Sequence, residues 1–115
     1  MILAAPDRIQ GITLTGTDKV VLSQSYGRNN KSTLFFYDNP IGEKPHSTTN
    51  LNGKQVPVFF LDGKLPCETV QAPPMTEGLA YADGVLYILF ESGADKYANG
   101  GGKDPTENVW TMIID

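Results

Sequence analysis

Two polar loops of this chain carry the side chains best suited to bind a ligand. One loop contains Tyr26 and Arg28, and the other contains Lys96 and Tyr97. An Arg and a Lys beside two tyrosines can hold a carboxylate, a phosphate or a sugar, because the guanidinium offers a bidentate fork and the rings offer a stacking face. We interpret these four residues as a candidate site for a small polar or anionic ligand; the alternative is that they are solvated loop residues.

Two carboxylates are the next candidates for chemistry. Glu91 ends an apolar stretch, which is compatible with a functional carboxylate on an inner face and equally with a hydrogen bond to neighbouring backbone. Glu77 and Glu91 would act as a paired acid and base only at a short separation, which their positions in the chain do not define. No glycosidase pattern surrounds them.

The other reactive side chains favour structural roles. His46, the single histidine, has no nucleophile or orienting acid near it in the chain, so we expect a surface loop residue. Cys67 is the single cysteine, which excludes an internal disulfide and a cysteine-rich metal site, and we expect it to be a small buried residue. Residues 100–104 resemble a phosphate-binding loop but lack the Ser or Thr after Lys103, so a mobile loop is the better interpretation.

Composition excludes two classes of partner. The net charge is −4, and the nine basic residues are scattered, whereas a nucleic-acid surface needs them clustered. The longest wholly apolar run covers residues 85–90, and a membrane-spanning helix needs about 20 residues. The start of the chain lacks a basic region and reaches Pro6 too early for a secretory signal. We expect a soluble chain without a signal peptide; the compartment stays open, with a slight lean to the cytoplasm.

The positioning elements are predicted to be strands, in an all-β fold. Twelve glycines and eight prolines leave little room for long helices. Asp62-Gly63 and Asp83-Gly84 suit two-residue hairpin turns. Short runs rich in β-branched and aromatic residues predict strands over residues 12–15, 20–25, 33–37, 56–61, 79–82, 85–91 and 109–114.

Two of these strands are apolar on both faces. Residues 34–37 and 86–90 lack the alternation of a strand with one wet face. Such strands need cover on two sides, which predicts sheets stacked face to face, as in a sandwich or a propeller.

An internal repeat is visible when the chain is shifted by 67 positions. After residue 25 the second copy is longer, and the excess forms a glycine-rich loop at residues 97–103. The alternative is chance similarity between two hairpins. Without a gap, the shift superimposes four matches: Ala5-Pro6 on Ala72-Pro73, Gly11 on Gly78, Leu22 on Leu89 and Ser25 on Ser92.

The repeat predicts a single domain of 115 residues made of two four-stranded antiparallel blades, at about residues 2–61 and 69–115. Two blades cannot close a propeller, which typically needs about 4 to 8. We therefore expect a homo-oligomer, in which the N-terminal strand of one copy pairs with the C-terminal strand of the next, and a trimer would give a six-bladed ring. The alternatives are a piece of a longer propeller or a sandwich that dimerises.

The repeats also carry a family resemblance. The second contains Glu77-Gly78-Leu79-Ala80-Tyr81, residues 86–94 and Lys96-Tyr97, and the first contains Gln10-Gly11 and residues 22–28. With these motifs the chain resembles uncharacterised bacterial β-propeller proteins over nearly its whole length, apart from residues 39–55. The resemblance implies a propeller fold, at the C-terminal part of a longer propeller, and no particular activity.

A more distant similarity is to the calcium-dependent gluconolactonase-type propellers. There a Glu followed by Gly on an inner strand supplies a metal ligand, and Glu77 is the one residue here that fits, since the first repeat has Gln10 in its place. This implies calcium or another divalent cation, which wants about 6 to 8 oxygen ligands. The leading expectation is a binding or scaffold module, and the alternative is a metal-assisted hydrolase of the lactonase type.

Overall fold

The computed structural model describes residues 1–61, 68–91 and 108–114, and these residues form an all-β fold. No helix in this part of the chain is long and apolar enough to cross a membrane. The strands are β1 (Ile2–Ala4), β2 (Ile9–Leu14), β3 (Lys19–Gln24), β4 (Ser32–Asp38), β5 (Ser47–Leu51), β6 (Lys54–Phe60), β7 (Glu68–Ala72), β8 (Thr76–Ala82), β9 (Val85–Phe90) and β10 (Trp110–Ile113).

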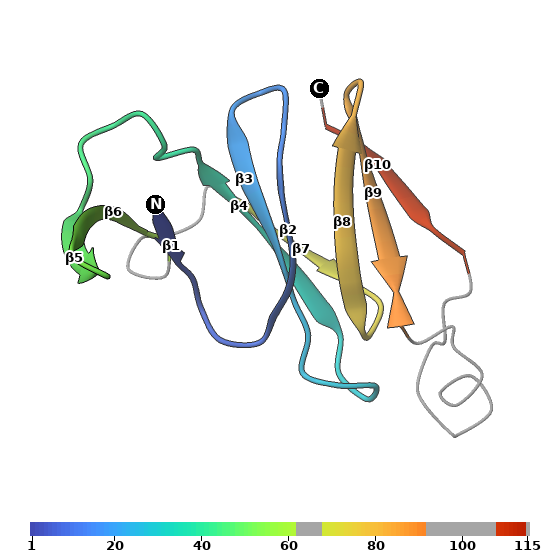
Figure 1. Ribbon diagram of the computed structural model, residues 1–115. Helices are drawn as coiled ribbons and strands as arrows, with labels where there is room; N and C mark the ends of the chain where they lie inside the picture. Colours follow the sequence, from blue (N-terminus) through green and yellow to red (C-terminus); the bar gives the residue numbers. More distant parts are fainter. Residues whose placement is uncertain (62–67, 92–107, 115) are drawn as a thin grey trace.

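The strands form three sheets that lie side by side (Figure 1). The central sheet has the order β2-β3-β4-β7 and is antiparallel throughout. On one side of it lies the sheet β8-β9-β10, also antiparallel, and on the other side lies the sheet β1-β6-β5. In this last sheet β5 and β6 form a hairpin and β1 runs parallel to β6. The predicted N-terminal strand thus exists, and it pairs with β6 of its own chain.

The middle strands of the central sheet, β3 and β4, are buried on both faces, as residues 34–37 predict. One face packs Val21, Leu34 and Phe36 against the sheet β8-β9-β10. The opposite face packs Val20, Leu22 and Tyr37 against Leu61 and β1. Because both faces are covered, β3 needs no polar alternation.

For the second apolar run, the described residues supply cover on one face only. In β9, Leu86, Ile88 and Phe90 are buried in the core, whereas Tyr87 and Leu89 are exposed. The physical reason is that the described chain places a sheet against one face of β8-β9-β10 and not against the other. We call the uncovered side, with Tyr87 and Leu89, the outer face.

The turns explain which strands could be predicted. Asp83 and Gly84 both have positive φ, which confirms the predicted two-residue hairpin, whereas Asp62-Gly63 lies outside the described residues. Strand β5 was missed, because its side chains are all exposed and polar apart from Leu51, so no apolar pattern marks it. Its signal was the turn Asn52-Gly53, which also has positive φ.

The hairpins β2–β3 and β8–β9 begin in the same way. Arg8 and Met75 precede β2 and β8, and both have positive φ, of 59° and 65°. The carbonyl of Arg8 accepts a hydrogen bond from the amide of Ser25 (3.2 Å), and the carbonyl of Met75 accepts one from the amide of Glu91 (3.0 Å). A β-bulge follows in each hairpin.

The register corrects the gapless superposition of the two hairpins. Ile12 pairs with Leu22, whereas Leu79 pairs with Ile88. The counterpart of Leu22 is therefore Ile88 rather than Leu89, because the second turn is one residue shorter. It follows that Leu89 is the counterpart of Ser23.

Strand β2 approaches β8 closely, and this contact joins the two sheets. The hydroxyl of Ser23 donates to the carbonyl oxygen of Glu77 (2.9 Å). A Cβ atom on Gly11 would lie 2.2 Å from that same oxygen, so glycine is required there.

Candidate functional site

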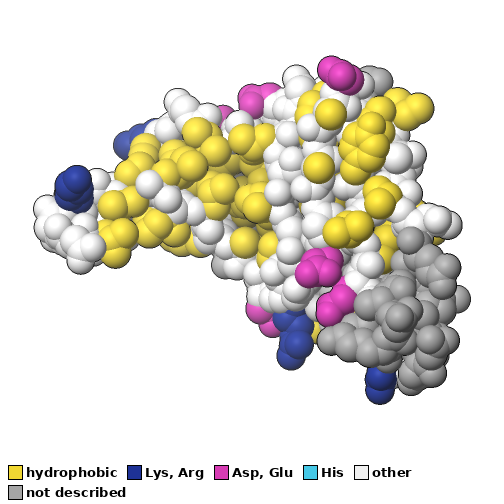
Figure 2. Space-filling model, turned by 45° about the vertical axis from the view of Figure 1, so that its right-hand side comes forward, with side chains coloured by type: hydrophobic (Ala, Val, Ile, Leu, Met, Phe, Trp, Pro, Cys, Tyr) yellow, Lys and Arg dark blue, Asp and Glu magenta, His cyan; other side chains and the backbone are white. Residues whose placement is uncertain are grey.

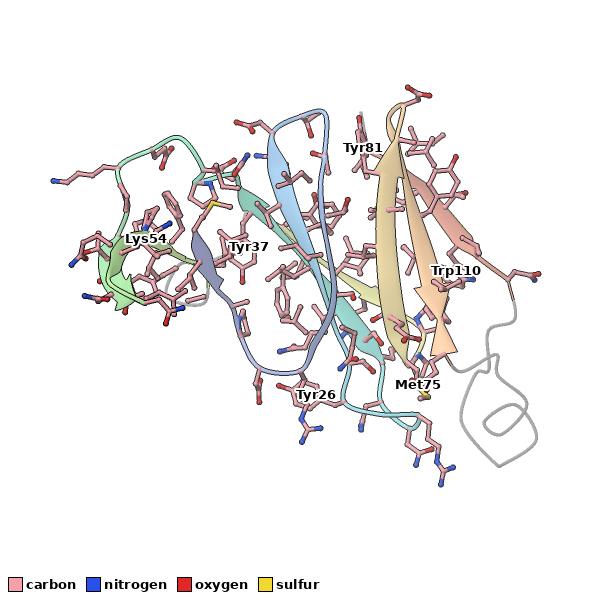
Figure 3. All side chains as sticks on the ribbon, in the orientation of Figure 1. Tyr26, Tyr37, Lys54, Met75, Tyr81 and Trp110 are labelled. Atoms are coloured by element: carbon pink, nitrogen blue, oxygen red, sulfur yellow. The ribbon has the colours of Figure 1, made fainter. Side chains whose placement is uncertain are left out.

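The predicted ligand residues are divided by the structure. Tyr26 and Arg28 are exposed in the loop between β3 and β4, and Figure 3 shows Tyr26 at the lower end of the molecule. Lys96 and Tyr97 lie outside the described residues, so the proposed pairing of the two loops stays a prediction.

Tyr26 is held by the segment that leads into β2. Its hydroxyl donates to the Asp7 carboxylate (3.0 Å), and the Arg8 guanidinium lies over its ring, 5.4 Å from the centroid. The hydrogen bond to Asp7 raises the pKa of Tyr26 above its ordinary value of 10.0, with partial desolvation and the Asp7 charge acting in the same direction. The arginine beside Tyr26 is thus Arg8, which is not among the predicted ligand residues.

A polar cleft lies where the segments leading into β2 and β8 meet. Its volume is about 210 Å³, and Met75, which Figure 3 places at this lower end of the molecule, lines it. Arg8 and Met75, the two residues with positive φ angles before these strands, both line it. The described residues that line the cleft are Arg8, Gln10, Ser25, Gly27, Met75, Thr76 and Glu91.

Thr76 is the distinctive residue of the cleft. Its side chain is 1% exposed, and its amide donates to the Ser32 hydroxyl (3.1 Å). Its own hydroxyl oxygen, Oγ1, is buried and has no hydrogen-bond partner in the described part of the protein. A buried polar group left in this way costs about 1–3 kcal/mol, so an unsatisfied hydroxyl in a polar cleft indicates a place for a missing partner.

The cleft contains side chains of opposite charge. Arg8 brings a guanidinium and Glu91 a half-buried carboxylate, while Gln10, Ser25 and Thr76 bring amide and hydroxyl groups. Donors and acceptors are thus both present, without a large excess of either charge. This chemistry suits a neutral ligand with several hydroxyl groups better than a strongly anionic one.

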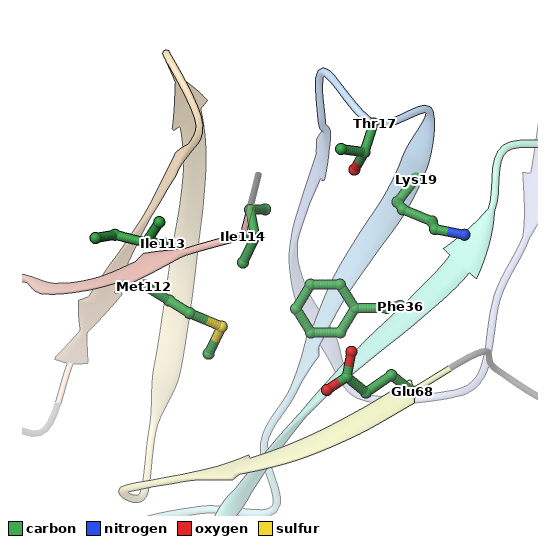
Figure 4. A pocket seen from close by; sticks show the side chains of 7 residues that line it. All are labelled: Thr17, Lys19, Phe36, Glu68, Met112, Ile113 and Ile114. Carbon is green, nitrogen blue, oxygen red and sulfur yellow. The ribbon is translucent and has the colours of Figure 1, made fainter.

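A second, larger cavity lies between the central sheet and β10 (Figure 4). It measures about 390 Å³, and Phe36, Met112, Ile113 and Ile114 form most of its wall. Lys19, at its rim, pairs with the Asp38 carboxylate. We rank it below the polar cleft, because none of the described side chains around it is a buried polar group without a partner.

Two further candidate residues, Glu77 and His46, lie on the surface. The Glu77 side chain is exposed on β8, and the described residues contain no group of three His, Cys, Asp or Glu side chains that could hold a metal ion. His46 is exposed, as expected, and its Nδ1 accepts a hydrogen bond from the amide of Phe60 (2.7 Å) while its ring stacks on the Phe60 ring. Cys67 and the loop 100–104 lie outside the described residues.

Only some of the residues that line the cleft were predicted from the sequence. Glu91 was considered and lines it, whereas Arg8 and Thr76 were missed. The repeat could have indicated them. Arg8 and Met75, the residue before Thr76, are 67 positions apart and occupy the same turn in the two hairpins. Comparison of the chain with models of known families, with curated proteins and with solved structures finds no match.

Proposed function

We propose that this chain is a binding module in which the central sheet and the sheet β8-β9-β10 are neighbouring blades of a propeller-like ring. Three observations support this arrangement. Both sheets are antiparallel and begin with consecutive strands, β2 to β4 and β8 to β10. The first strands, β2 and β8, lie beside each other, and Ser23 of β3 donates a hydrogen bond to the Glu77 carbonyl of β8. Both hairpins have a positive-φ residue before their first strand, Arg8 or Met75, and a bulge after it.

The ligand that we propose for the cleft is a small molecule rich in hydroxyl groups, such as a sugar. The observation that carries this proposal is the Thr76 hydroxyl, which is buried without a partner among mixed donors and acceptors. A ligand hydroxyl can satisfy it, while Arg8, Gln10 and Glu91 are suited to pair with neighbouring hydroxyls. Tyr26 lies beside Arg8 and offers an aromatic face at the edge of the cleft.

The test is a panel of mono- and disaccharides, measured by calorimetry against the wild type and Thr76→Val. Valine keeps the shape of threonine and removes the hydroxyl. We expect a sugar that binds the wild type to lose at least about tenfold in affinity, since one hydrogen bond contributes about 0.5–1.5 kcal/mol and a ligand hydroxyl left unpaired costs more. The matched control is Thr69→Val on β7, an exposed strand threonine outside the cleft, which should bind normally.

The unliganded protein gives a second measurement. Thr76→Val should be neutral or stabilising by about 1 kcal/mol in its free energy of unfolding, because it removes a buried hydroxyl that has no partner. Binding of a sugar should raise the melting temperature of the wild type by mass action. If no saccharide binds, or if Thr76→Val binds as tightly as the wild type, the proposal is wrong.

A further inference from the structure

The outer face of β8-β9-β10 is an exposed apolar surface. Leu89 and Val109 are each 52% exposed and Tyr87 is 40% exposed. Gly78, Leu79 and Ala80 complete a shallow hollow of about 320 Å³ with them. Figure 2, which turns this end of the molecule toward the reader, shows hydrophobic side chains over this part of the surface.

The central sheet shows what covers the equivalent face. By register, Val21 and Ser23 of β3 correspond to Tyr87 and Leu89 of β9. Val21 and Ser23 are fully buried, because β8 and its sheet lie against them. The outer face is therefore the surface that, one sheet earlier in the same chain, receives another sheet.

Gly78 is an independent sign of a missing neighbour. Gly11, its counterpart, must be glycine because the Glu77 carbonyl oxygen occupies the place of a Cβ atom, at 2.2 Å. At Gly78 a Cβ atom would meet nothing closer than Leu89, at 3.7 Å, and its φ is not left-handed. Within the described chain nothing requires glycine there, and a glycine inside a strand often marks the close approach of another backbone.

A second copy of this chain offers the matching surface. In the internal contact, Leu79 packs into the core between the two sheets. Its counterpart on β2 is Ile12, which is 49% exposed, as is Leu14 two residues on. Strand β2 of one copy is thus the equivalent of β8 in the internal contact. It can supply the covering strand that the outer face of another copy lacks.

We propose that two copies of this chain associate head to tail, with β2 of one copy docked on the outer face of β8-β9-β10 of the other. The carbonyl of Gln10 then approaches Gly78 as the carbonyl of Glu77 approaches Gly11, and Ile12 covers Leu89. The contact joins different surfaces of the two copies, so it can repeat and close a ring. This inference rests on the blade arrangement proposed above, and it does not depend on the ligand.

The first test is the mass of the chain in solution, measured by analytical ultracentrifugation over a range of concentrations. We expect the wild type to associate, and Gly78→Ala to weaken association at least tenfold. The variant should keep the circular dichroism spectrum and melting temperature of the dissociated wild type, because a Cβ atom fits at Gly78 within one chain. Thr111→Ala, on β10 at the same sheet, is a control that adds no atoms and should associate normally.

The second test distinguishes a head-to-tail contact from a two-fold one. One variant carries Gly78→Ala and Leu89→Ser, which block the outer face, and the other carries Ile12→Ser and Leu14→Ser, which block β2. Each alone should sediment as a single chain. An equal mixture should form a particle of two chains and no larger, because one intact outer face meets one intact β2.

Three outcomes would overturn the inference. They are a wild type that stays a single chain at every concentration, a Gly78→Ala variant that associates as tightly as the wild type, and a mixture that forms no two-chain particle. Saccharide binding by the cleft is measured separately on Gly78→Ala, so loss of association without loss of binding, or the reverse, shows which proposal fails.

Discussion

The central sheet and the sheet β8-β9-β10 share a hairpin design and differ in their cover. Leu22 on β3 is fully buried, since a layer of the protein lies on each face of the central sheet. Leu89 on β9 lies in a strand that is wholly apolar, and yet it is 52% exposed. The difference teaches that the composition of a strand does not decide its burial, which depends on whether another layer packs on each face.

The largest expected effect contrasts the two leucines. Leu22→Ala should lower the free energy of unfolding by about 2–5 kcal/mol, because it leaves a cavity in a buried core. Leu89→Ala should change it by less than about 0.5 kcal/mol in a dissociated chain, as is usual for surface positions. Chemical denaturation at low protein concentration measures both. Equal losses would mean that the two faces are covered alike.

The two glycines sharpen the comparison next. Gly11→Ala should lower the free energy of unfolding by about 1–3 kcal/mol, because the added methyl group overlaps the Glu77 carbonyl oxygen and pushes the sheets apart. Gly78→Ala should be neutral or slightly stabilising in the single chain, because alanine restricts the unfolded state. Thermal unfolding of both variants tests this. A destabilised Gly78→Ala chain would contradict the open space on the outer face.

A smaller effect is expected at the polar link between the sheets. Ser23→Ala removes the hydrogen bond to the carbonyl of Glu77 and should cost about 1 kcal/mol, the usual net contribution of one such bond. Ser47→Ala, on the exposed β5, is the control and should have almost no effect. Denaturant midpoints of the two variants give the comparison, and an unaffected Ser23→Ala would show that apolar packing alone joins the sheets.

The smallest effect concerns the loop after β3. The hydrogen bond to Asp7 favours the protonated form of Tyr26, so its pKa in the folded protein is raised above that of the unfolded chain. Any stability from this contact is therefore present below the ordinary tyrosine pKa of 10.0 and is lost as the pH rises through the raised pKa. Ultraviolet titration of the wild type against Tyr26→Phe isolates this group, and Asp7→Ala should bring its pKa back toward 10.0.

Much of the architecture could be predicted from local patterns. The β-branched and aromatic runs and the Asp83-Gly84 turn indicate strands and a hairpin, because these features act over a few residues. Strand β5 escaped, since its polar sequence makes pairing with β6 invisible without the partner strand. The cleft could not be predicted for a related reason. Arg8 and Thr76 are far apart in the chain, and both line the cleft only because β2 lies beside β8.

By itself the sequence determined the all-β class, the short strands and the need for stacked sheets, because periodicity and turn residues are properties of neighbouring residues. Tertiary structure alone decided that Gly11 is enclosed while Gly78 is open, and that Leu22 is buried while Leu89 is exposed. The physical reason is that burial depends on what packs against a face. Residues 1–61, 68–91 and 108–114 supply such a neighbour to both sides of the central sheet and to one side of β8-β9-β10.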